Sequence, residues 1–171
     1  IMLNVLKKHN DSYKWNESSF EKIKRISNTK VGTVGQDFIE ALCKTLSYQC
    51  KFPLNPKGER ATQSPWDIEI NEIKFELKTA TEDIGGAFQF NHIRYHRPYD
   101  GVICLGISPE EILFNMWSKS EILTGKAGNL ASMEKGANAS YKLTKRPRTL
   151  NNIDQFSAIF STFERKYKAS Q

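Results

Sequence analysis

Two carboxylates and a lysine stand close together in the middle of the chain, at Asp67, Glu76 and Lys78. Polar and apolar residues alternate on both sides of an Asn-Glu pair at 71–72, which is typical of two strands that each bury one face. Asparagine tolerates a positive φ angle, so this pair fits a two-residue hairpin turn. Because side chains two apart on a strand share a face, the pattern predicts a β-hairpin with all three charged groups on one side.

The register of this hairpin predicts that the two carboxylates oppose each other. Counting outward from the turn places Asp67 across from Glu76, with Cβ atoms about 4.5–5.5 Å apart. Three further cross-strand pairs follow from the same register: Ile70 with Ile73, Glu69 with Lys74, and Ile68 with Phe75. Opposed like charges destabilise a strand pair, and a divalent cation would offset their repulsion. Mg²⁺ is commonly held by one or two carboxylates and phosphate oxygens, so a Mg²⁺ site is predicted at Asp67 and Glu76, with Mn²⁺ as a substitute.

Lys78 completes an arrangement that suits phosphodiester hydrolysis. Beside a bound metal ion, its amine can orient a water and help deprotonate it, or stabilise charge on a phosphate in transfer. The alternative is a solvated strand face, since Glu-x-Lys occurs often by chance. Asp67 on the facing strand, together with hydrophobic residues on the other face, favours the catalytic interpretation.

Asp67 followed by the Glu-Leu-Lys run at 76–78 resembles the signature of the PD-(D/E)xK nuclease superfamily, to which most type II restriction endonucleases belong. The resemblance covers about residues 30–118 and departs in one place, where Trp66 separates Pro65 from Asp67. It implies a metal-dependent deoxyribonuclease that binds double-stranded DNA in a bacterial cytoplasm. It also implies a restriction-endonuclease-like α/β (α+β) fold, in which helices flank a central mixed β-sheet.

In that superfamily an acidic residue on the helix before the hairpin often completes the metal site. Residues 31–42 resemble that helix. They also resemble the glycine-rich helix start of mismatch-repair nicking endonucleases, although the Gly-to-Glu spacing differs by one residue. Glu40 is the expected equivalent, as a catalytic and metal-binding residue. Asp37 and Gln36 lie one turn earlier on the same side and stay as alternatives.

Size and charge agree with a DNA-binding domain. At 171 residues, with 39% hydrophobic and 11% aromatic residues, the chain predicts one folded domain rather than a disordered segment. The catalytic core is expected at about 30–118, followed by a basic arm and helix at about 124–171. A net charge of +6 favours a polyanion as partner, and nucleic acid is the leading candidate, although many basic proteins bind none.

The sequence also predicts where the protein acts. No run of about 18 apolar residues occurs, so no membrane span is expected. Residues 1–8 lack the order and length of a signal peptide. Cys43, Cys50 and Cys104 have no metal-ligand spacing and are expected to be reduced. These features predict an intracellular, cytoplasmic protein.

A second segment of interest, residues 87–97, interleaves aromatic residues with hydrogen-bonding and basic groups. It is expected to form a helix that faces DNA and ends at Pro98. Its candidate DNA contacts are Gln89, Asn91, His92, Arg94, His96 and Arg97. Gln and Asn pair well with adenine, Arg pairs with guanine, and all of them can hold phosphates. A core helix with a polar outer side is an equally weighted alternative.

The basic run at 141–148 predicts a strand or arm that contacts phosphates. Its candidate DNA contacts are Lys142, Lys145, Arg146 and Arg148. Cations at a phosphate backbone release counterions, so such contacts make affinity depend on salt. A solvated charged loop is the alternative.

Other elements follow from periodicity and capping signals. The expected elements are a short helix opened by a capping box at Ser18, a helix over 35–47, a loop over 52–64, a buried strand over 101–107, a strand over 112–118, a short helix from Ser120 and an amphipathic helix over 153–168. Strands interspersed with helices indicate an α/β or α+β domain.

These features together predict a Mg²⁺-dependent DNA endonuclease, most simply a type II restriction enzyme. One duplex needs two cuts and one chain holds one site, so a two-fold homodimer is expected. A nickase, a subunit of a heteromeric nuclease, an exonuclease or a junction resolvase stays open as an alternative nuclease. From other classes, a non-catalytic nucleic-acid-binding module and a protein-interaction domain stay open.

Overall fold

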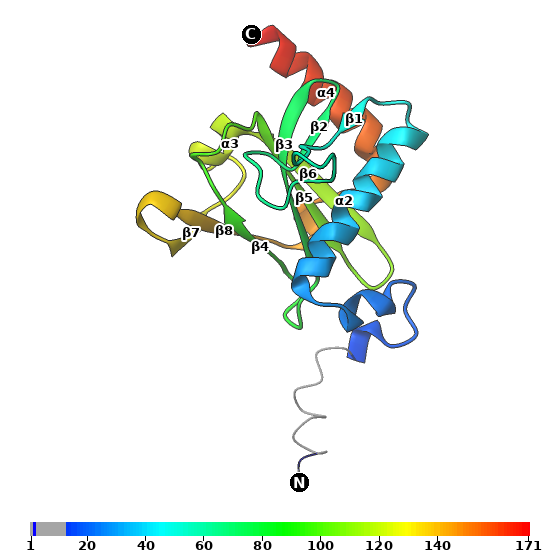
Figure 1. The fold of residues 1–171 in the computed structure, drawn as a ribbon. Coiled ribbons are helices and arrows are strands. Elements are labelled where there is room, and N and C mark those ends of the chain that lie inside the picture. The colour runs from blue at the N-terminus through cyan, green and yellow to red at the C-terminus, as the bar shows by residue number, and fades with distance from the viewer. Residues whose placement is uncertain (1, 3–12) are drawn as a thin grey trace.

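A computed structural model describes residue 2 and residues 13–171 (Figure 1). The expectation that residues 1–8 are not a signal peptide falls, apart from Met2, outside the described residues. Among the described helices, none combines the length and apolar character that crossing a membrane requires.

A six-stranded sheet forms the centre of the structure (Figure 1). Its strands, in spatial order, are β1 (Cys50–Lys51), β2 (Ile68–Ile70), β3 (Ile73–Thr81), β5 (Gly101–Ile107), β6 (Ile112–Ser118) and β9 (Asn151–Asn152). The sheet is mixed, because β3 and β5 run parallel while the other pairs are antiparallel. Every residue of β5 is buried, which explains its uninterrupted apolar sequence. The predicted strands at 101–107 and 112–118 are confirmed.

Two long helices cover one face of the central sheet. They are α2 (Asn28–Thr45) and α4 (Phe156–Ala169). Ile39 of α2 and Phe160 of α4 are fully buried in one core cluster with Phe75 of β3. Phe163 of α4 also packs on Phe75, with ring centroids 5.3 Å apart. The amphipathic pattern predicted for the C-terminal helix is therefore confirmed, and the helix begins after a short 3₁₀ turn, η5 (Ile153–Gln155).

A second, three-stranded sheet covers the other face, and we call it the small sheet. Its strands, in spatial order, are β4 (Phe88–Ile93), β8 (Ser140–Lys145) and β7 (Leu130–Glu134). Phe88 and Phe90 of β4 and Leu143 of β8 join a buried cluster with Val102 of β5. The short helix α3 (Lys119–Leu123) adds Ile122 to this cluster. The mixed α+β class, with a central mixed sheet flanked by helices, is thus confirmed.

The predicted hairpin is present in its predicted register. β2 and β3 pair through the three predicted couples, Ile70–Ile73, Glu69–Lys74 and Ile68–Phe75. Asn71 and Glu72 both have positive φ angles, 47° and 69°. A two-residue turn with two positive φ angles matches the twist of the flanking strands, so the turn fixes which residues face each other.

Two predicted helix starts are wrong. α2 begins at Asn28 instead of residue 35, because the Ser27 side chain accepts a hydrogen bond from Lys30 N and caps the helix. Ser18 does not open a capped helix, since its hydroxyl donates to the Trp15 carbonyl at 2.7 Å. The chain there forms 3₁₀ turns, η1 (Tyr13–Trp15) and η2 (Glu21–Arg25). Near the C-terminus, η3 (Gly136–Asn138) and η4 (Pro147–Thr149) are further 3₁₀ turns.

The largest correction concerns residues 87–97, which form no helix: residues 88–93 form strand β4, and 94–97 follow it as a turn. Phe88 and Phe90 point into the core while Gln89 between them is half-buried, so the pattern has a period of two. The register with β8 then shifts between Phe90 and Ile93, where His92 has a φ of 58°. This irregularity interrupts the alternation of buried and exposed side chains, so the sequence pattern does not indicate a strand.

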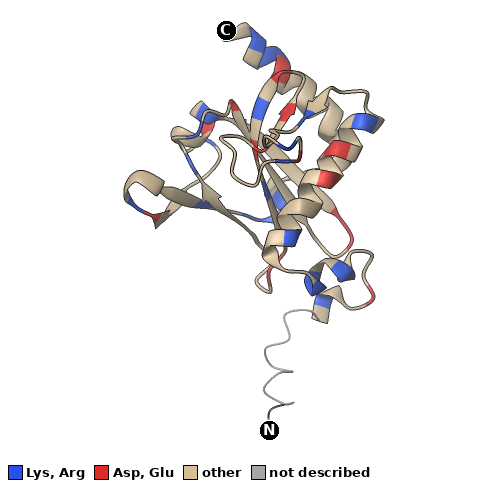
Figure 2. Ribbon diagram, in the orientation of Figure 1, with Lys and Arg blue, Asp and Glu red and all other residues tan. Residues whose placement is uncertain are grey.

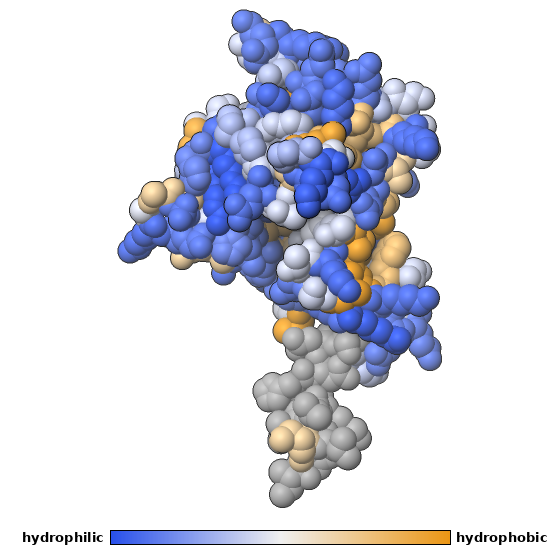
Figure 3. Space-filling model, in the orientation of Figure 1, coloured by the Kyte–Doolittle hydropathy of each residue, from blue (hydrophilic) through white to orange (hydrophobic). Residues whose placement is uncertain are grey.

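An apolar hollow of about 380 Å³ lies between η2, α2 and the ends of β5 and β6. Phe20, Ile23, Val34 and Phe38 contribute to its lining. Apolar surface beside the N-terminal half of α2 is visible in Figure 3. The helices therefore leave part of this face uncovered within the described residues.

Two glycines of α2 provide a test of how tightly the helix meets the sheet. A Cβ atom at Gly35 would lie 1.9 Å from Thr79 Oγ1 and 2.9 Å from Thr79 Cβ, whereas one at Gly32 meets nothing within 4 Å. We expect Gly35→Ala to lower the free energy of unfolding by about 1–3 kcal/mol, since it overpacks the contact with β3. Gly32→Ala should raise it by about 0.5–1 kcal/mol through helix propensity. Urea unfolding of both variants measures the difference, and shifts of the same sign would contradict the close helix–sheet contact.

Candidate active site on the central hairpin

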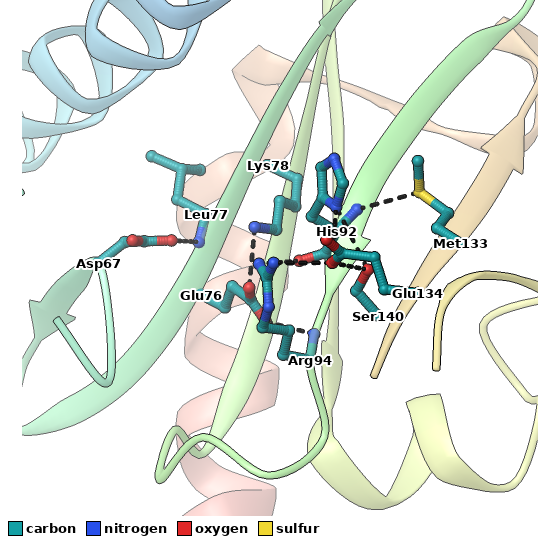
Figure 4. Close-up of polar contacts among 9 residues, drawn as sticks. All are labelled: Asp67, Glu76, Leu77, Lys78, His92, Arg94, Met133, Glu134 and Ser140. Atoms are coloured by element: carbon teal, nitrogen blue, oxygen red, sulfur yellow. Dashed lines mark hydrogen bonds and ion pairs between the residues drawn. The ribbon is translucent and has the colours of Figure 1, made fainter. Parts of the chain in front are cut away.

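Glu76 and Lys78 form an ion pair on strand β3 (Figure 4). Glu76 Oε1 lies 2.8 Å from Lys78 Nζ, and the two side chains are 1% and 17% exposed. The second carboxylate oxygen, Oε2, accepts a hydrogen bond from the backbone N–H of Arg94 at 3.3 Å. An isolated charge at this depth would cost several kcal/mol. The ammonium and the amide are therefore what allow a carboxylate to remain inside the protein.

Glu76 Oε1 keeps capacity for a further ligand. Among the described residues it makes no hydrogen bond, although the Lys78 ammonium lies beside it. The Tyr99 hydroxyl is buried without a partner in the same way. Burial raises the pKa of Tyr99, and the charge of Glu76 adds to the effect. Burial likewise raises the pKa of the Cys104 thiol. The surroundings of Glu76 thus have a low dielectric constant, in which charges interact strongly.

Asp67 directly precedes β2 and is bound to the edge of β3. Its backbone N–H donates at 2.9 Å to the carbonyl of Phe75, which is the register partner of Ile68, so the predicted pairing of Asp67 with Glu76 is not part of the ladder. Its Oδ2 accepts a hydrogen bond from Leu77 N at 2.8 Å. In Figure 4, Asp67 approaches one side of β3 while Glu76 and Lys78 lie on the other. Among the described residues no hydrogen bond or ion pair joins Asp67 to Glu76, and binding to the amide reduces the repulsion predicted between them.

The acidic residues of α2 are paired with an arginine from the loop over 52–64. Asp37 Oδ1 lies 2.6 Å from Arg60 Nη1, and Glu40 Oε2 pairs with Arg60 Nη2. The Arg60 guanidinium lies 3.7 Å from the centroid of the Phe52 ring. Figure 2 shows acidic residues in red on α2. Of the three residues expected to complete the metal site, only Gln36 lines a hollow with Asp67, of about 380 Å³. We call it the Asp67 hollow.

The donor atoms fit a magnesium ion in part. Asp67 and Glu76 supply one carboxylate each, and Glu76 Oε1 has no hydrogen bond within the described part of the chain. No group of three or more His, Cys, Asp or Glu side chains gathers to hold a metal among residues 13–171. Mg²⁺ keeps several waters and commonly takes only one or two carboxylates, so Asp67 and Glu76 match it in number, although they lie on opposite sides of β3 (Figure 4).

Lys78 lines a second hollow, of about 340 Å³, which we call the Lys78 hollow. Its lining is completed by Gln89 and Asn91 of β4, residues 79–81 of β3, Asp83 and the first residues of α2. Two of the predicted DNA contacts therefore lie beside the predicted catalytic lysine. Asp83 was not predicted, and its only signal in the sequence is its place just before the Gly-Gly pair at 85–86.

Two other predicted DNA contacts belong to a cluster on the small sheet (Figure 4). Arg94 Nη2 lies 2.9 Å from Glu134 Oε2, and His92 Nδ1 lies 3.4 Å from the same oxygen. The Ser140 hydroxyl donates to that oxygen at 2.6 Å. The Ser140 hydrogen bond lowers the pKa of Glu134, and His92 and Arg94 add to the effect. His92 and Arg94 are therefore paired with Glu134 in this structure.

The remaining predicted DNA contacts are scattered. Lys145 Nζ donates to the Ala127 carbonyl at 2.8 Å and lies over the Trp117 ring, so this lysine does not face solvent freely. Arg146 donates to the Gly85 carbonyl at 3.2 Å. The others are Lys142 and Arg97, which are half-buried, and Arg148 and His96, which are exposed. The strand predicted within 141–148 is confirmed as β8, while its role in phosphate contact stays a prediction.

Comparison with known proteins gives one weak similarity. No family model matches the chain, and no curated protein matches it. A solved structure titled "The structure of a bacterial homing endonuclease: I-Ssp6803I" is similar with a TM-score of 0.47 and 10% sequence identity. The match covers 82% of this chain and 99% of that chain. At this TM-score and identity, nothing about activity follows from the similarity.

The Asp83 carboxylate generates a prediction about pH. Burial raises its pKa, but hydrogen bonds from the Gln89 side chain and from backbone N–H groups outweigh this and lower the pKa below its ordinary value. A group with a lowered pKa in the folded state stabilises the fold above its unfolded pKa and loses this effect as pH falls through the folded value. Asp83→Asn should therefore be less stable than wild type near pH 6, and the difference should shrink below about pH 4. Urea midpoints across this range measure it, and a constant difference would contradict the assignment.

Proposed function

We propose that the protein is a metal-dependent DNA endonuclease that hydrolyses phosphodiester bonds. The observation that carries this proposal is the buried Glu76–Lys78 ion pair, which lies beside a polar hollow on the strand that Asp67 also contacts. A lysine and a carboxylate held together in a low-dielectric site suit charge stabilisation and proton transfer better than the same pair on an exposed surface.

Each hairpin residue has a role in this proposal. Asp67 and Glu76 hold Mg²⁺, or Mn²⁺ in its place, through the carboxylate oxygens that keep capacity for a ligand. The metal ion supplies an activated water and neutralises charge on the phosphate when it is bound. Lys78 orients the attacking water, and its ammonium, which lies 2.8 Å from Glu76 Oε1, stabilises the negative charge that develops on the phosphate.

Double-stranded DNA is the proposed substrate. The chain carries a net charge of +6, and the first turn of α2 lies between the Asp67 hollow and the Lys78 hollow. Helix N-termini favour anions, which suits a phosphate backbone that crosses both hollows. We propose a type II restriction endonuclease that acts as a two-fold homodimer, because one site per chain then delivers two cuts. A nickase or a subunit of a heteromeric nuclease would need one chain at the DNA.

Cleavage of supercoiled plasmid tests the activity directly. Wild type should cut in Mg²⁺ and not in EDTA, and Lys78→Ala should cut at least about 100-fold more slowly, which is typical of losing a group that stabilises charge in the transition state. Lys74→Ala is the matched control, since Lys74 lies on the same strand and face but over the Trp66 ring. This control should keep nearly full activity.

The pattern of products separates the forms of the proposal. Discrete linear fragments support a restriction enzyme, nicked circles support a nickase, and conversion only of linear DNA supports an exonuclease. If wild type leaves plasmids of varied sequence intact across divalent metals but still binds DNA, the activity is refuted and a non-catalytic binding module takes its place.

Glu40 is part of the proposal as an acid that assists the metal site, directly or through water. It shares Arg60 with Asp37, so the two acids form a matched pair for comparison. Glu40→Gln should raise the Mg²⁺ concentration needed for half-maximal cleavage by several-fold, because a ligand or second-layer carboxylate is lost. Asp37→Asn should leave that concentration unchanged. If both variants raise the required Mg²⁺ concentration equally, Glu40 acts through its ion pair with Arg60 and does not assist the metal site.

A further inference from the structure

Gln89 occupies a fixed position in the Lys78 hollow. It lies on β4 between Phe88 and Phe90, which are both fully buried and stack with ring centroids 6.0 Å apart. Since alternate residues of a strand face opposite sides, the burial of the two phenylalanines directs Gln89 away from the core. Its amide therefore faces the same space as Lys78.

Two neighbours determine how the Gln89 amide is oriented. Gln89 Nε2 donates to Asp83 Oδ2 at 3.0 Å, and the Thr144 hydroxyl donates to Gln89 Oε1 at 2.6 Å. An ionised carboxylate can only accept, so the amide nitrogen and not the oxygen must face Asp83. Asp83 is itself held, because its Oδ1 accepts from Ala87 N at 2.9 Å. The side chain is thus locked at both ends before any ligand arrives.

This arrangement leaves half of the amide's hydrogen-bonding capacity unused. A glutamine amide has two N–H donors and two acceptor sites on its oxygen, and Asp83 and Thr144 use one of each. One donor and one acceptor remain. In the DNA major groove, adenine presents an acceptor at N7 and a donor at N6, a pattern that a glutamine or asparagine amide matches with two hydrogen bonds.

We infer that Gln89 recognises an adenine base near the cleaved phosphate, with Asp83 and Thr144 as positioning residues. The inference rests on the proposed function in so far as the Lys78 hollow receives DNA. Locking the amide beforehand removes the conformational entropy that a free side chain would lose on binding. His92 and Arg94 are less suited, because each must first leave Glu134.

Selection from a library of random duplexes tests this inference by binding alone. The full chain is incubated with the library in Ca²⁺, and bound DNA is sequenced for wild type, Gln89→Ala and Thr144→Val. Wild type should enrich adenine at one or more positions, and Gln89→Ala should lose between about 5-fold and about 150-fold of the preference at one of them, as for one bidentate base contact. Thr144→Val keeps the shape but loses the hydroxyl, so it should relax the same position less strongly. Ser132→Ala, an exposed change on β7, is the control and should match wild type.

Each outcome separates this inference from the proposed activity. If wild type selects adenine and Gln89→Ala loses it, the inference stands even where no plasmid is cut. If Gln89→Ala and Thr144→Val keep the wild-type preference for adenine, the inference is overturned and the nuclease proposal is unaffected. If wild type binds no DNA, the inference is overturned as well. Urea unfolding of both variants confirms that the loss does not come from misfolding, and Thr144→Val gives the answer where Gln89→Ala is unstable.

Discussion

The burial of the Glu76 carboxylate constrains most of what surrounds it. At 1% exposure the charge is tolerated only because the Lys78 ammonium and the Arg94 amide lie against its two oxygens. Both partners come from defined places: Lys78 is two residues along the same strand, and Arg94 directly follows β4. The small sheet must therefore dock where it does for Glu76 Oε2 to have a hydrogen-bond donor. Replacing a buried ion pair with apolar residues of similar volume is often neutral or stabilising, so a functional role explains this pair better than a contribution to stability.

Strand β3 is the element on which the other layers converge. Its apolar face packs on α2 and α4, and its other face carries Glu76 and Lys78 toward the small sheet. Its central position comes from pairing with β2 on one side and β5 on the other. The pairing of β3 with β2 stops at Phe75, however. The next edge amide of β3, Leu77 N, donates its hydrogen bond to the Asp67 side chain instead. The same interruption that exposes this edge also brings a second carboxylate beside the strand, close to the proposed site.

Much of this arrangement follows from local sequence. The alternation around Asn71-Glu72 specifies the hairpin register, because a shift of one residue would turn every core side chain outward. The continuous apolar run at 101–107 predicts strand β5 equally directly, and the spacing of the phenylalanines predicts helix α4. Strand β4 cannot be predicted in this way, since His92 at a positive φ angle breaks the alternation of buried and exposed residues. Nor can the pairing of Arg60 with Asp37 and Glu40 be predicted, because it joins residues of a loop and a helix that are 23 and 20 positions apart. Such contacts depend on tertiary geometry that a pattern does not encode.

Strand β4 also links the proposed recognition of DNA to the proposed chemistry. Gln89 near its start is fixed by the stacked Phe88 and Phe90, while Arg94 just after its end binds the Glu76 carboxylate through its backbone. The bulge at His92 lies between these two points and changes the direction of the chain. A shift of β4 on contact with a base would therefore alter the hydrogen bond to Glu76 Oε2, and with it the position of the carboxylate beside Lys78. The proposed recognition and the proposed activation are in this way connected through the short segment from Gln89 to Arg94.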